Sequence, residues 1–310
     1  MAQSITIETT NIRSLKINDT SECRKKLKLL LANQPDIAIV TECQITTPNY
    51  ELLDRNFRYE LASYVCVLNP NGRRGILALI KKQITILYST IINGDMLKLG
   101  LEAGDTKFAL FAVYAPSQGQ DIEFFLRVRS LQLNCDEPHQ IICGDFNTTL
   151  NTSLDKQGYI TDGHWTTREV IREWIDSEEG HCLSDIFRLC NPNSATFTWR
   201  NRGLTQQARL DYILASDWLS GNATRCTIRH YPWSVTDHST VAAVFKLETA
   251  KKGPGTFRCL PLLETNADYC REVKHTIRNT IIEVSNKNNI DKADSILTQH
   301  RINQLTLLYN

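Results

Sequence analysis

The feature that most constrains the fold of this chain is a series of short apolar runs, each ending at a polar or charged residue. Ile37–Val40 ends at Thr41-Glu42, Phe108–Val113 ends at Tyr114, and His139–Cys143 ends at Gly144-Asp145. Short apolar runs bounded by such residues are typical of buried strands. Helices are expected at 21–33, which has an amphipathic pattern, and at 121–133 and 168–177. This interleaving predicts a mixed α and β fold.

Further strands are expected on either side of these segments. The opening residues alternate polar and apolar side chains, as a half-buried strand does. The complete set of additional strands predicted is Ser4–Thr10, Gly75–Ile80, Leu210–Leu214 and Ser239–Leu247. Between Trp199 and Arg209, the polar segment Arg200–Gln207 contains a glycine and suits a hairpin loop.

The amino-acid composition restricts the class of protein only broadly. The chain has 310 residues, 42% hydrophobic and 22% charged, which fits one large globular domain with an appendage. Its net charge of +1 is not that of a protein that coats nucleic acid. Acidic metal ligands can offset basic phosphate contacts, so charge neither supports nor excludes a nucleic-acid substrate. No secretory signal and no membrane-spanning run is seen, so we expect a soluble, intracellular chain without a membrane partner.

Composition changes near residue 250. Lys251-Lys252-Gly253-Pro254-Gly255 is a good linker candidate because glycine and proline interrupt regular structure. Beyond it, Tyr269, Val273, Ile277 and Ile281 recur at helical spacing as an apolar stripe. We therefore predict a catalytic domain at 1–248, a linker at 249–258 and a helical tail at 259–310.

Residue types suited to catalysis gather at the ends of the predicted strands. Any one of them would be explained by a turn or a helix cap. Together they indicate side chains that a rigid sheet presents to a shared cleft. The candidates are Asn11, Glu42, Tyr114, Asp145, Asn147, Asp211, Asp237 and His238.

Hydrolysis of a phosphodiester would explain these residue types. The reaction needs charge stabilisation, an activated water and a stabilised leaving oxygen. Glu42 is a hard oxygen ligand suited to Mg²⁺, and Asp237 would help to hold the metal or protonate the leaving group. Asp145 would orient or deprotonate the water. His238 would donate to a phosphate oxygen, with Asp211 on its other nitrogen fixing the tautomer.

Three neutral candidates complete this set. Asn11, Asn147 and Tyr114 carry amide and phenol groups that donate hydrogen bonds to phosphate oxygens. Because these donors are uncharged, they add no repulsion between the site and its substrate.

The ordered motifs resemble those of the endonuclease/exonuclease/phosphatase superfamily over nearly all of residues 4–247. The motifs are Asn11, Thr41-Glu42, Val113–Pro116, Gly144–Asn147, Ser184-Asp185, Thr196–Trp199, Arg209–Ile213 and Thr236–His238. The resemblance implies a DNase I-like α/β (α+β) fold: a four-layer α-β-β-α sandwich with two mixed central sheets and the active site at one edge. It also implies hydrolysis with Mg²⁺, or Mn²⁺ as an alternative. The eight candidates match the catalytic set of relatives, and Thr196 matches a phosphate contact.

Two segments resemble one branch of that superfamily. Leu150–Asp155 is similar to the LINE-type (non-LTR) retrotransposon endonucleases. Gly253–Arg258, followed by Leu262-Leu263, is similar to the segment that leads to their reverse transcriptase. The resemblance implies an apurinic-type endonuclease domain that nicks double-stranded DNA, in the nucleus, for target-primed reverse transcription. A reverse transcriptase domain of the same polyprotein would be its partner.

Other functions with the same fold remain open. Abasic-site repair endonucleases commonly carry an acidic residue two positions after the first Asn, where this chain has Arg13. They also tend to carry a bulky apolar residue where this chain has Ala208. Both differences favour the LINE-type interpretation. Another phosphoesterase activity and a decayed, non-catalytic DNA-binding copy are the remaining alternatives. Decay is disfavoured because all eight catalytic candidates are present.

Contacts with DNA are predicted at four residues. Arg200 and Arg202 lie in the predicted hairpin, which would enter a groove of the duplex. Thr196 and Thr236 would contact substrate phosphates. The alternative for the hairpin is an ordinary solvated loop.

Overall fold

The computed structural model describes residues 4–117, 122–159, 165–176, 182–247, 267, 269–276 and 278. The chain divides into two units, Met1–Glu248 and Thr249–Asn310, and each is considered by itself. In the second unit the described residues, which include Tyr269 and Val273, are helical. The predicted linker at 249–258 lies outside the described residues, as do Ile277 and Ile281 of the apolar stripe.

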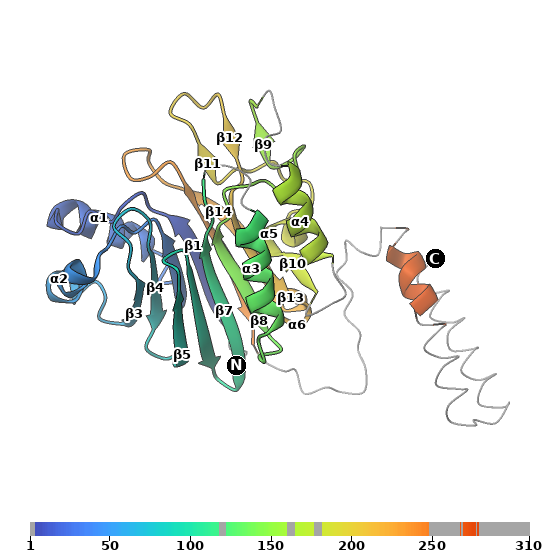
Figure 1. Ribbon diagram of the computed structural model, residues 1–310, viewed down its shortest axis with the longest axis horizontal. Helices are drawn as coiled ribbons and strands as arrows, with labels where there is room; N and C mark the ends of the chain where they lie inside the picture. The colour runs from blue at the N-terminus through green and yellow to red at the C-terminus, as the bar shows by residue number, and fades with distance from the viewer. Residues whose placement is uncertain are drawn as a thin grey trace. The chain divides into compact units, whose positions relative to one another are not determined.

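The first unit is built around two six-stranded mixed sheets (Figure 1). The first sheet has the order β14 (Ala223–His230), β15 (Ser239–Lys246), β1 (Ser4–Asn11), β2 (Ile37–Thr41), β4 (Ile76–Lys81) and β3 (Tyr64–Asn69). The second has the order β10 (Leu183–Asp185), β13 (Asp211–Ser216), β8 (Gln140–Asp145), β7 (Thr106–Tyr114), β6 (Met96–Ala103) and β5 (Thr85–Ile92). A small third sheet joins β11 (Trp199–Arg200), β12 (Gln207–Ala208) and β9 (Lys156–Gln157).

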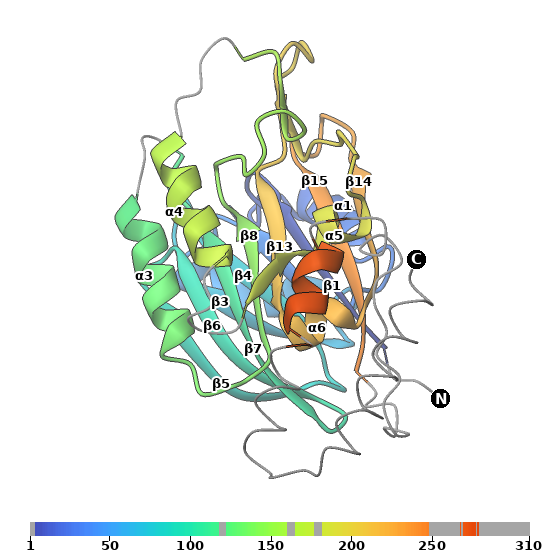
Figure 2. The same cartoon turned by 90° about the vertical axis from the view of Figure 1, so that its right-hand side faces the viewer.

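Four helices cover the outer faces of the large sheets: α1 (Thr20–Leu30), α2 (Thr47–Phe57), α3 (Ile122–Leu133) and α4 (Trp165–Ile175). The short α5 (Ile186–Cys190) and α6 (Asp217–Gly221) instead pack with the cluster between the sheets. Leu27 of α1 and Phe57 of α2 pack with Leu79 of the first sheet. Figure 2 shows α3 and α4 side by side over the second sheet. Phe124 of α3 and Trp174 of α4 belong to the cluster on that sheet. A third cluster fills the space between the sheets, so the predicted four-layer sandwich is confirmed.

The chain direction explains why the candidate residues can meet. β1 and β2 are parallel and pair Asn11 with Thr41, whereas β15 runs antiparallel to β1 and begins just after His238. In the second sheet, parallel β7 and β8 pair Tyr114 with Asp145, and antiparallel β13 pairs Asp211 with Asp145. The carboxyl ends of four strands and the amino ends of two therefore lie at one edge of the sandwich.

Several elements were not predicted from the sequence: α2, β3, β5, β6, β9, β10, α5, α6 and β14. β5 and β6 form a hairpin whose turn contains Asn93 and Gly94, both with positive φ. The predicted hairpin at Arg200–Gln207 is present, because β11 pairs antiparallel with β12.

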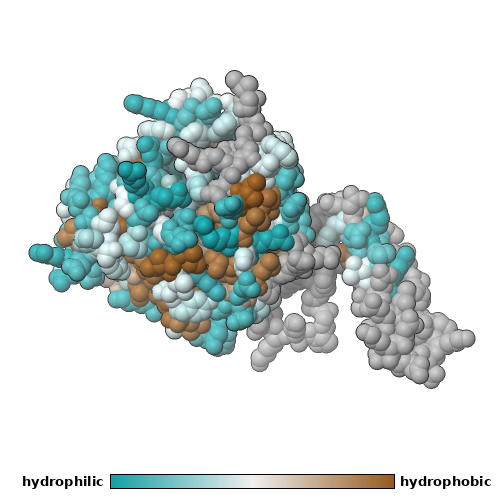
Figure 3. All heavy atoms as spheres, viewed as in Figure 1, coloured by the Kyte–Doolittle hydropathy of each residue, from teal (hydrophilic) through white to brown (hydrophobic). Residues whose placement is uncertain are grey.

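The surface of the first unit is mixed in character. Hydrophobic residues gather on part of the face shown in Figure 3, and β5 and α3 expose Leu87, Ile91, Leu126 and Leu133. Among the residues that the structure describes, no helix is both long enough and apolar enough to cross a membrane.

Candidate active site

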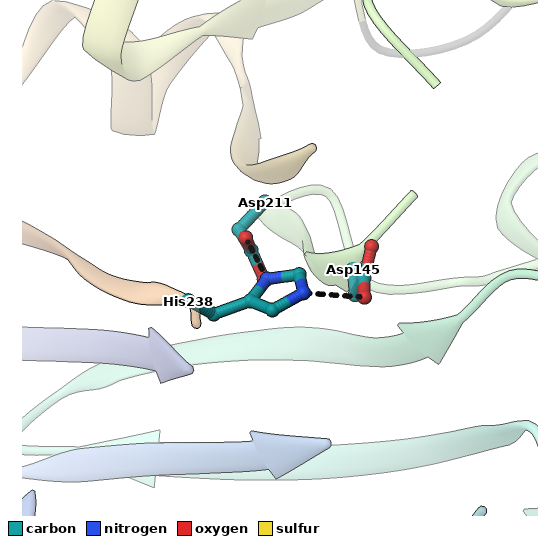
Figure 4. Close-up of side chains that lie close together, drawn as sticks. All are labelled: Asp145, Asp211 and His238. Atoms are coloured by element: carbon teal, nitrogen blue, oxygen red, sulfur yellow. Dashed lines mark hydrogen bonds and ion pairs between the residues drawn. The ribbon is translucent and has the colours of Figure 1, made fainter. Parts of the chain in front are cut away.

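The centre of the site is a histidine held between two buried aspartates (Figure 4). His238 Nδ1 lies 2.8 Å from Asp211 Oδ2, and its Nε2 lies 4.0 Å from Asp145 Oδ2. The predicted pairing of Asp211 with His238 therefore appears in the structure. Asp145 is 1% exposed and Asp211 is fully buried, so the charges of this group are shielded from water.

Burial and charge together set the protonation of this centre. Burial and the nearby Asp211 carboxylate raise the pKa of Asp145 to about 7, although His238 opposes the shift. Burial lowers the pKa of His238, but the ion pair and hydrogen bond with Asp211 outweigh it and raise that pKa to about 9. A carboxyl group that titrates near neutral pH is suited to accept a proton from an attacking water.

Asn11 ties the two sheets together at this edge, and Thr236 holds Asn11 next to His238. Asn11 Nδ2 donates a hydrogen bond of 2.9 Å to Asp145 Oδ2. Thr236 Oγ1 donates to the Asn11 carbonyl at 2.8 Å and accepts from the His238 backbone N–H at 3.1 Å. Both side chains are 2% exposed, so Thr236 positions Asn11 and His238 from inside the protein. Its predicted contact with substrate phosphate stays a prediction.

Asn147 lies beside Asp145 at the end of β8. Its backbone N–H donates to Asp145 Oδ1 at 2.9 Å, and its Nδ2 donates to the Ala115 carbonyl at 2.8 Å. Asn147 has a φ of +49°, a conformation that is uncommon for a residue with a side chain. Asn is among the residue types that adopt this conformation most readily, and the turn holds the Asn147 N–H against the Asp145 carboxylate.

Glu42 and Tyr114 form the other side of the site. Tyr114 Oη donates to Glu42 Oε2 at 3.1 Å, and Gln44 Nε2 donates to Glu42 Oε1 at 3.2 Å. Arg74 donates to the Tyr114 carbonyl, and its guanidinium carbon lies 4.1 Å from the centre of the Tyr114 ring. Burial and the Glu42 carboxylate raise the pKa of Tyr114, which keeps the phenol a hydrogen-bond donor.

The donor set fits a divalent cation. Ligand atoms of Asp145, Asp211 and His238 lie within 4.8 Å of one another. The buried Oδ1 atoms of Asp211 and Asp237 accept no hydrogen bond from the described residues. Buried carboxylate oxygens without donors are expensive unless a cation satisfies them. Glu42 is partly exposed and has each oxygen oriented by one donor, as a carboxylate ligand of Mg²⁺ requires.

The predicted DNA contacts lie around the small third sheet. The Arg200 guanidinium donates to the Tyr231 carbonyl at 2.6 Å, so one of its nitrogens is committed inside the protein. Arg202 is exposed in the hairpin between β11 and β12. Thr196 Oγ1 lies 2.8 Å from Ser194 Oγ in the loop before β11. The structure leaves Arg202 the most accessible of the three.

Thr198 is a positioning residue that the sequence did not single out. It is fully buried, and its Oγ1 accepts hydrogen bonds from the backbone N–H groups of Leu210 and Asp211 at 2.9 and 3.0 Å. Its carbonyl accepts from Ser239, directly after His238. Thr198 therefore fixes the backbone of both members of the Asp211–His238 pair.

Lys26 of α1 is buried, although an amphipathic helix usually places its lysines on the solvent-exposed face. The side chain is 2% exposed, and its Nζ donates to the carbonyls of Ile12 at 3.0 Å, Arg13 at 3.4 Å and Ser14 at 2.7 Å. Arg13 and Ser14 have φ values of +46° and +71°, so an ammonium group holds together a loop with a left-handed path. This loop directly follows Asn11.

Replacing Lys26 with Met should lower the free energy of unfolding by about 2–4 kcal/mol, because three carbonyls lose a charged donor. Phosphodiester hydrolysis, the activity that the sequence predicts, should also fall at temperatures where the variant is folded, because the loop directly follows Asn11. Denaturant unfolding and a phosphodiesterase assay measure the two effects. Lys28→Met, at an exposed position of the same helix, is the control. Equal stability of the two variants would show that Lys26 does not hold the loop.

The protein has two central sheets and a buried Asp–His centre at their common edge. This combination is typical of hydrolases of the phosphodiesterase or nuclease class. Residues 9–238 match the model of the Endonuclease/Exonuclease/phosphatase family. The chain therefore belongs to that family.

Solved structures of relatives share the fold. An AP endonuclease from Archaeoglobus fulgidus has a TM-score of 0.65 at 16% identity, covering 78% of this chain and 99% of that one. The 3′ phosphatase NExo from Neisseria, bound to a product DNA hairpin, has a TM-score of 0.64 at 16% identity and covers 78% and 99%. The catalytic domain of Xenopus laevis APE2 has a TM-score of 0.60 at 19% identity and covers 80% and 94%. These similarities confirm the DNase I-like architecture.

Proposed function

We propose that this protein is a Mg²⁺-dependent endonuclease that nicks intact double-stranded DNA. Mn²⁺ would be the alternative metal. The observation that carries the proposal is the convergence of Asn11, Asp145, Asp211 and His238 from four strand ends, with neighbouring polar atoms 2.8 to 4.0 Å apart. Convergence of acid, amide and imidazole groups is what phosphodiester hydrolysis requires.

Each residue of the site would have a distinct task. Asp145 would accept a proton from the attacking water, with Asn11 and Asn147 holding its carboxylate in place. His238, kept protonated by Asp211, would donate a hydrogen bond to a non-bridging phosphate oxygen. Glu42 and Asp237 would hold the cation, which when bound supplies positive charge to the phosphate.

The residues that surround the site favour intact DNA over an abasic site. Ala208, where a bulky apolar side chain would line a pocket for a flipped sugar, is 1% exposed and belongs to the short strand β12. The related structures named as AP endonucleases are the observation that favours the alternative, an abasic-site enzyme. At 16% identity the fold alone is shared, and the pocket residues decide the substrate.

The biological role that we propose is the nicking of target DNA during integration of a LINE-type retrotransposon. The support is the sequence resemblance at Leu150–Asp155 and Gly253–Arg258. This role would place the enzyme at nuclear DNA, and a reverse transcriptase domain of the same polyprotein would extend the exposed 3′ end. The catalytic domain at 1–248 and the tail at 259–310 are part of the same proposal.

A comparison of labelled duplexes tests the substrate. One duplex is intact, the second carries one abasic-site analogue, and the third ends in a 3′ phosphate. We expect Mg²⁺-dependent internal cuts in the intact duplex, at rates within about tenfold of those for the abasic duplex. A preference for the abasic duplex of about 100-fold or more would establish the repair-type alternative. Cleavage confined to the 3′ phosphate would identify an end-processing phosphatase.

A further inference from the structure

Arg13 lies at the mouth of the site and is not one of the predicted catalytic residues. Its Nη1 lies 3.3 Å from Asp237 Oδ2, and its side chain is 54% exposed whereas that of Asp237 is 14% exposed. The pair joins the loop after β1 to the loop before β15. The guanidinium therefore lies between the interior of the site and solvent.

The backbone that carries Arg13 is fixed in place. The Arg13 backbone N–H donates to Asn11 Oδ1 at 3.1 Å, and its carbonyl accepts from Lys26 Nζ. The next residue, Ser14, donates its N–H to the Glu42 carbonyl at 2.8 Å. Arg13 is thus tied to Asn11 and to the residue proposed to bind the metal. A side chain on such a rigid base is pre-organised for a ligand.

Charge at this position is permanent. An arginine side chain stays protonated in proteins and presents five N–H donors in a planar fork. One guanidinium nitrogen forms an ion pair with Asp237 Oδ2, and that oxygen accepts a hydrogen bond from Trp199 Nε1 at 3.2 Å. Because more than half of the Arg13 side chain is exposed, its other donors face solvent at the mouth of the site. A phosphate oxygen is the ligand that this fork matches best.

We propose that Arg13 is a fixed cation of this site, which binds a backbone phosphate of the nucleic-acid substrate while it neutralises Asp237. The guanidinium then supplies positive charge beside Asp237 in addition to the cation that Glu42 and Asp237 would hold. The inference rests on the proposed function only in taking a nucleic acid as the substrate.

Two consequences follow from this role. Removing the guanidinium removes one phosphate contact, which lowers both the affinity for DNA and the dependence of that affinity on salt. Replacing it with a carboxylate places a second acidic group beside Asp237, which strengthens binding of a divalent cation in the absence of DNA.

Fluorescence anisotropy with an intact duplex, in chelator so that no cleavage occurs, measures the first consequence. Between about 50 and about 200 mM salt, Arg13→Met should bind more weakly and reduce the slope of log K against log salt by about 1. Arg13→Lys should keep the slope but lose part of the affinity, because an ammonium group lacks the fork. Arg55→Met, at an exposed position of α2, is the matched control and should bind like the wild type.

Titration of the free proteins with Mn²⁺ measures the second consequence. Arg13→Asp should bind Mn²⁺ at least about tenfold more tightly than the wild type. The inference would be overturned if Arg13→Met left the salt slope unchanged or lowered it no more than Arg55→Met does. It would also be overturned if Arg13→Asp bound Mn²⁺ no more tightly than the wild type. Failure of the proposed function is separate, because it would appear as absence of cutting by the wild type while these binding differences persist.

Discussion

Replacing Asp145 with Asn should lower the rate of DNA nicking by about 10³-fold while leaving the protein folded. Asn has nearly the same shape as Asp, but it cannot accept the proton of the attacking water. It also removes the charge that faces His238 across 4.0 Å. Single-turnover cleavage of an intact duplex in Mg²⁺ measures the loss. Asp105→Asn, in the exposed turn between β6 and β7, is the control.

Asp145 and His238 are expected to act as one unit. His238→Ala should cost a similar factor, and the double variant should be only slightly slower than either single variant, because groups that act in one step are not additive. If Asp145→Asn cleaved DNA at a rate within about tenfold of the wild-type rate, Asp145 could not be the general base.

Replacing Gly144 with Ala should lower the free energy of unfolding by more than about 4 kcal/mol. Gly144 has a φ of +142°, which a residue with a side chain rarely adopts, and an added Cβ would lie 1.9 Å from the carbonyl oxygen of Val113. That atom belongs to the backbone of the neighbouring strand β7, so relief of the clash requires the strands to separate. Because Asp145 follows directly, activity should fall as well.

The chain offers a matched control for this substitution. An added Cβ at Gly221 in α6 meets nothing within 4 Å. Gly221→Ala should therefore change stability by less than about 1 kcal/mol. Denaturant unfolding of the two variants makes the comparison, and similar midpoints would show that close packing at Gly144 does not constrain the fold.

The strand ends were predictable because the signal is local. A buried strand needs a short apolar run, and the polar residue that ends it stands out from the run. Asn11, Glu42, Tyr114 and Asp145 were found in this way, and parallel strands then bring such residues to one edge. The contact between Asp211 and His238 was predicted from the chemistry that a histidine requires.

Some elements were missed although a signal was present. The Asn93-Gly94 pair is a strong indicator of a tight hairpin turn and would have predicted the β5–β6 hairpin. Pro48 in the first turn of α2 is likewise a helix-start signal.

Other features were beyond the reach of sequence patterns. Lys26 has the sequence environment of a solvated lysine, and only the path of the loop after Asn11 gives its charge a buried partner. The pairing of Arg13 with Asp237 joins segments far apart in the chain and has no local signature. The same holds for the buried pairing of Arg209 with Asp155 and Asp185. Such contacts depend on tertiary geometry, which no spacing rule encodes.

The most direct test of the central claim is nicking of supercoiled plasmid by the wild-type protein, first in excess chelator and then after Mg²⁺ is restored. The account predicts no nicking in chelator, recovery of open-circular product with Mg²⁺, and no recovery in His238→Ala prepared in parallel. Nicking that persists in chelator, or that His238→Ala retains at the wild-type rate, would contradict the assignment of metal-dependent phosphodiester hydrolysis to this site.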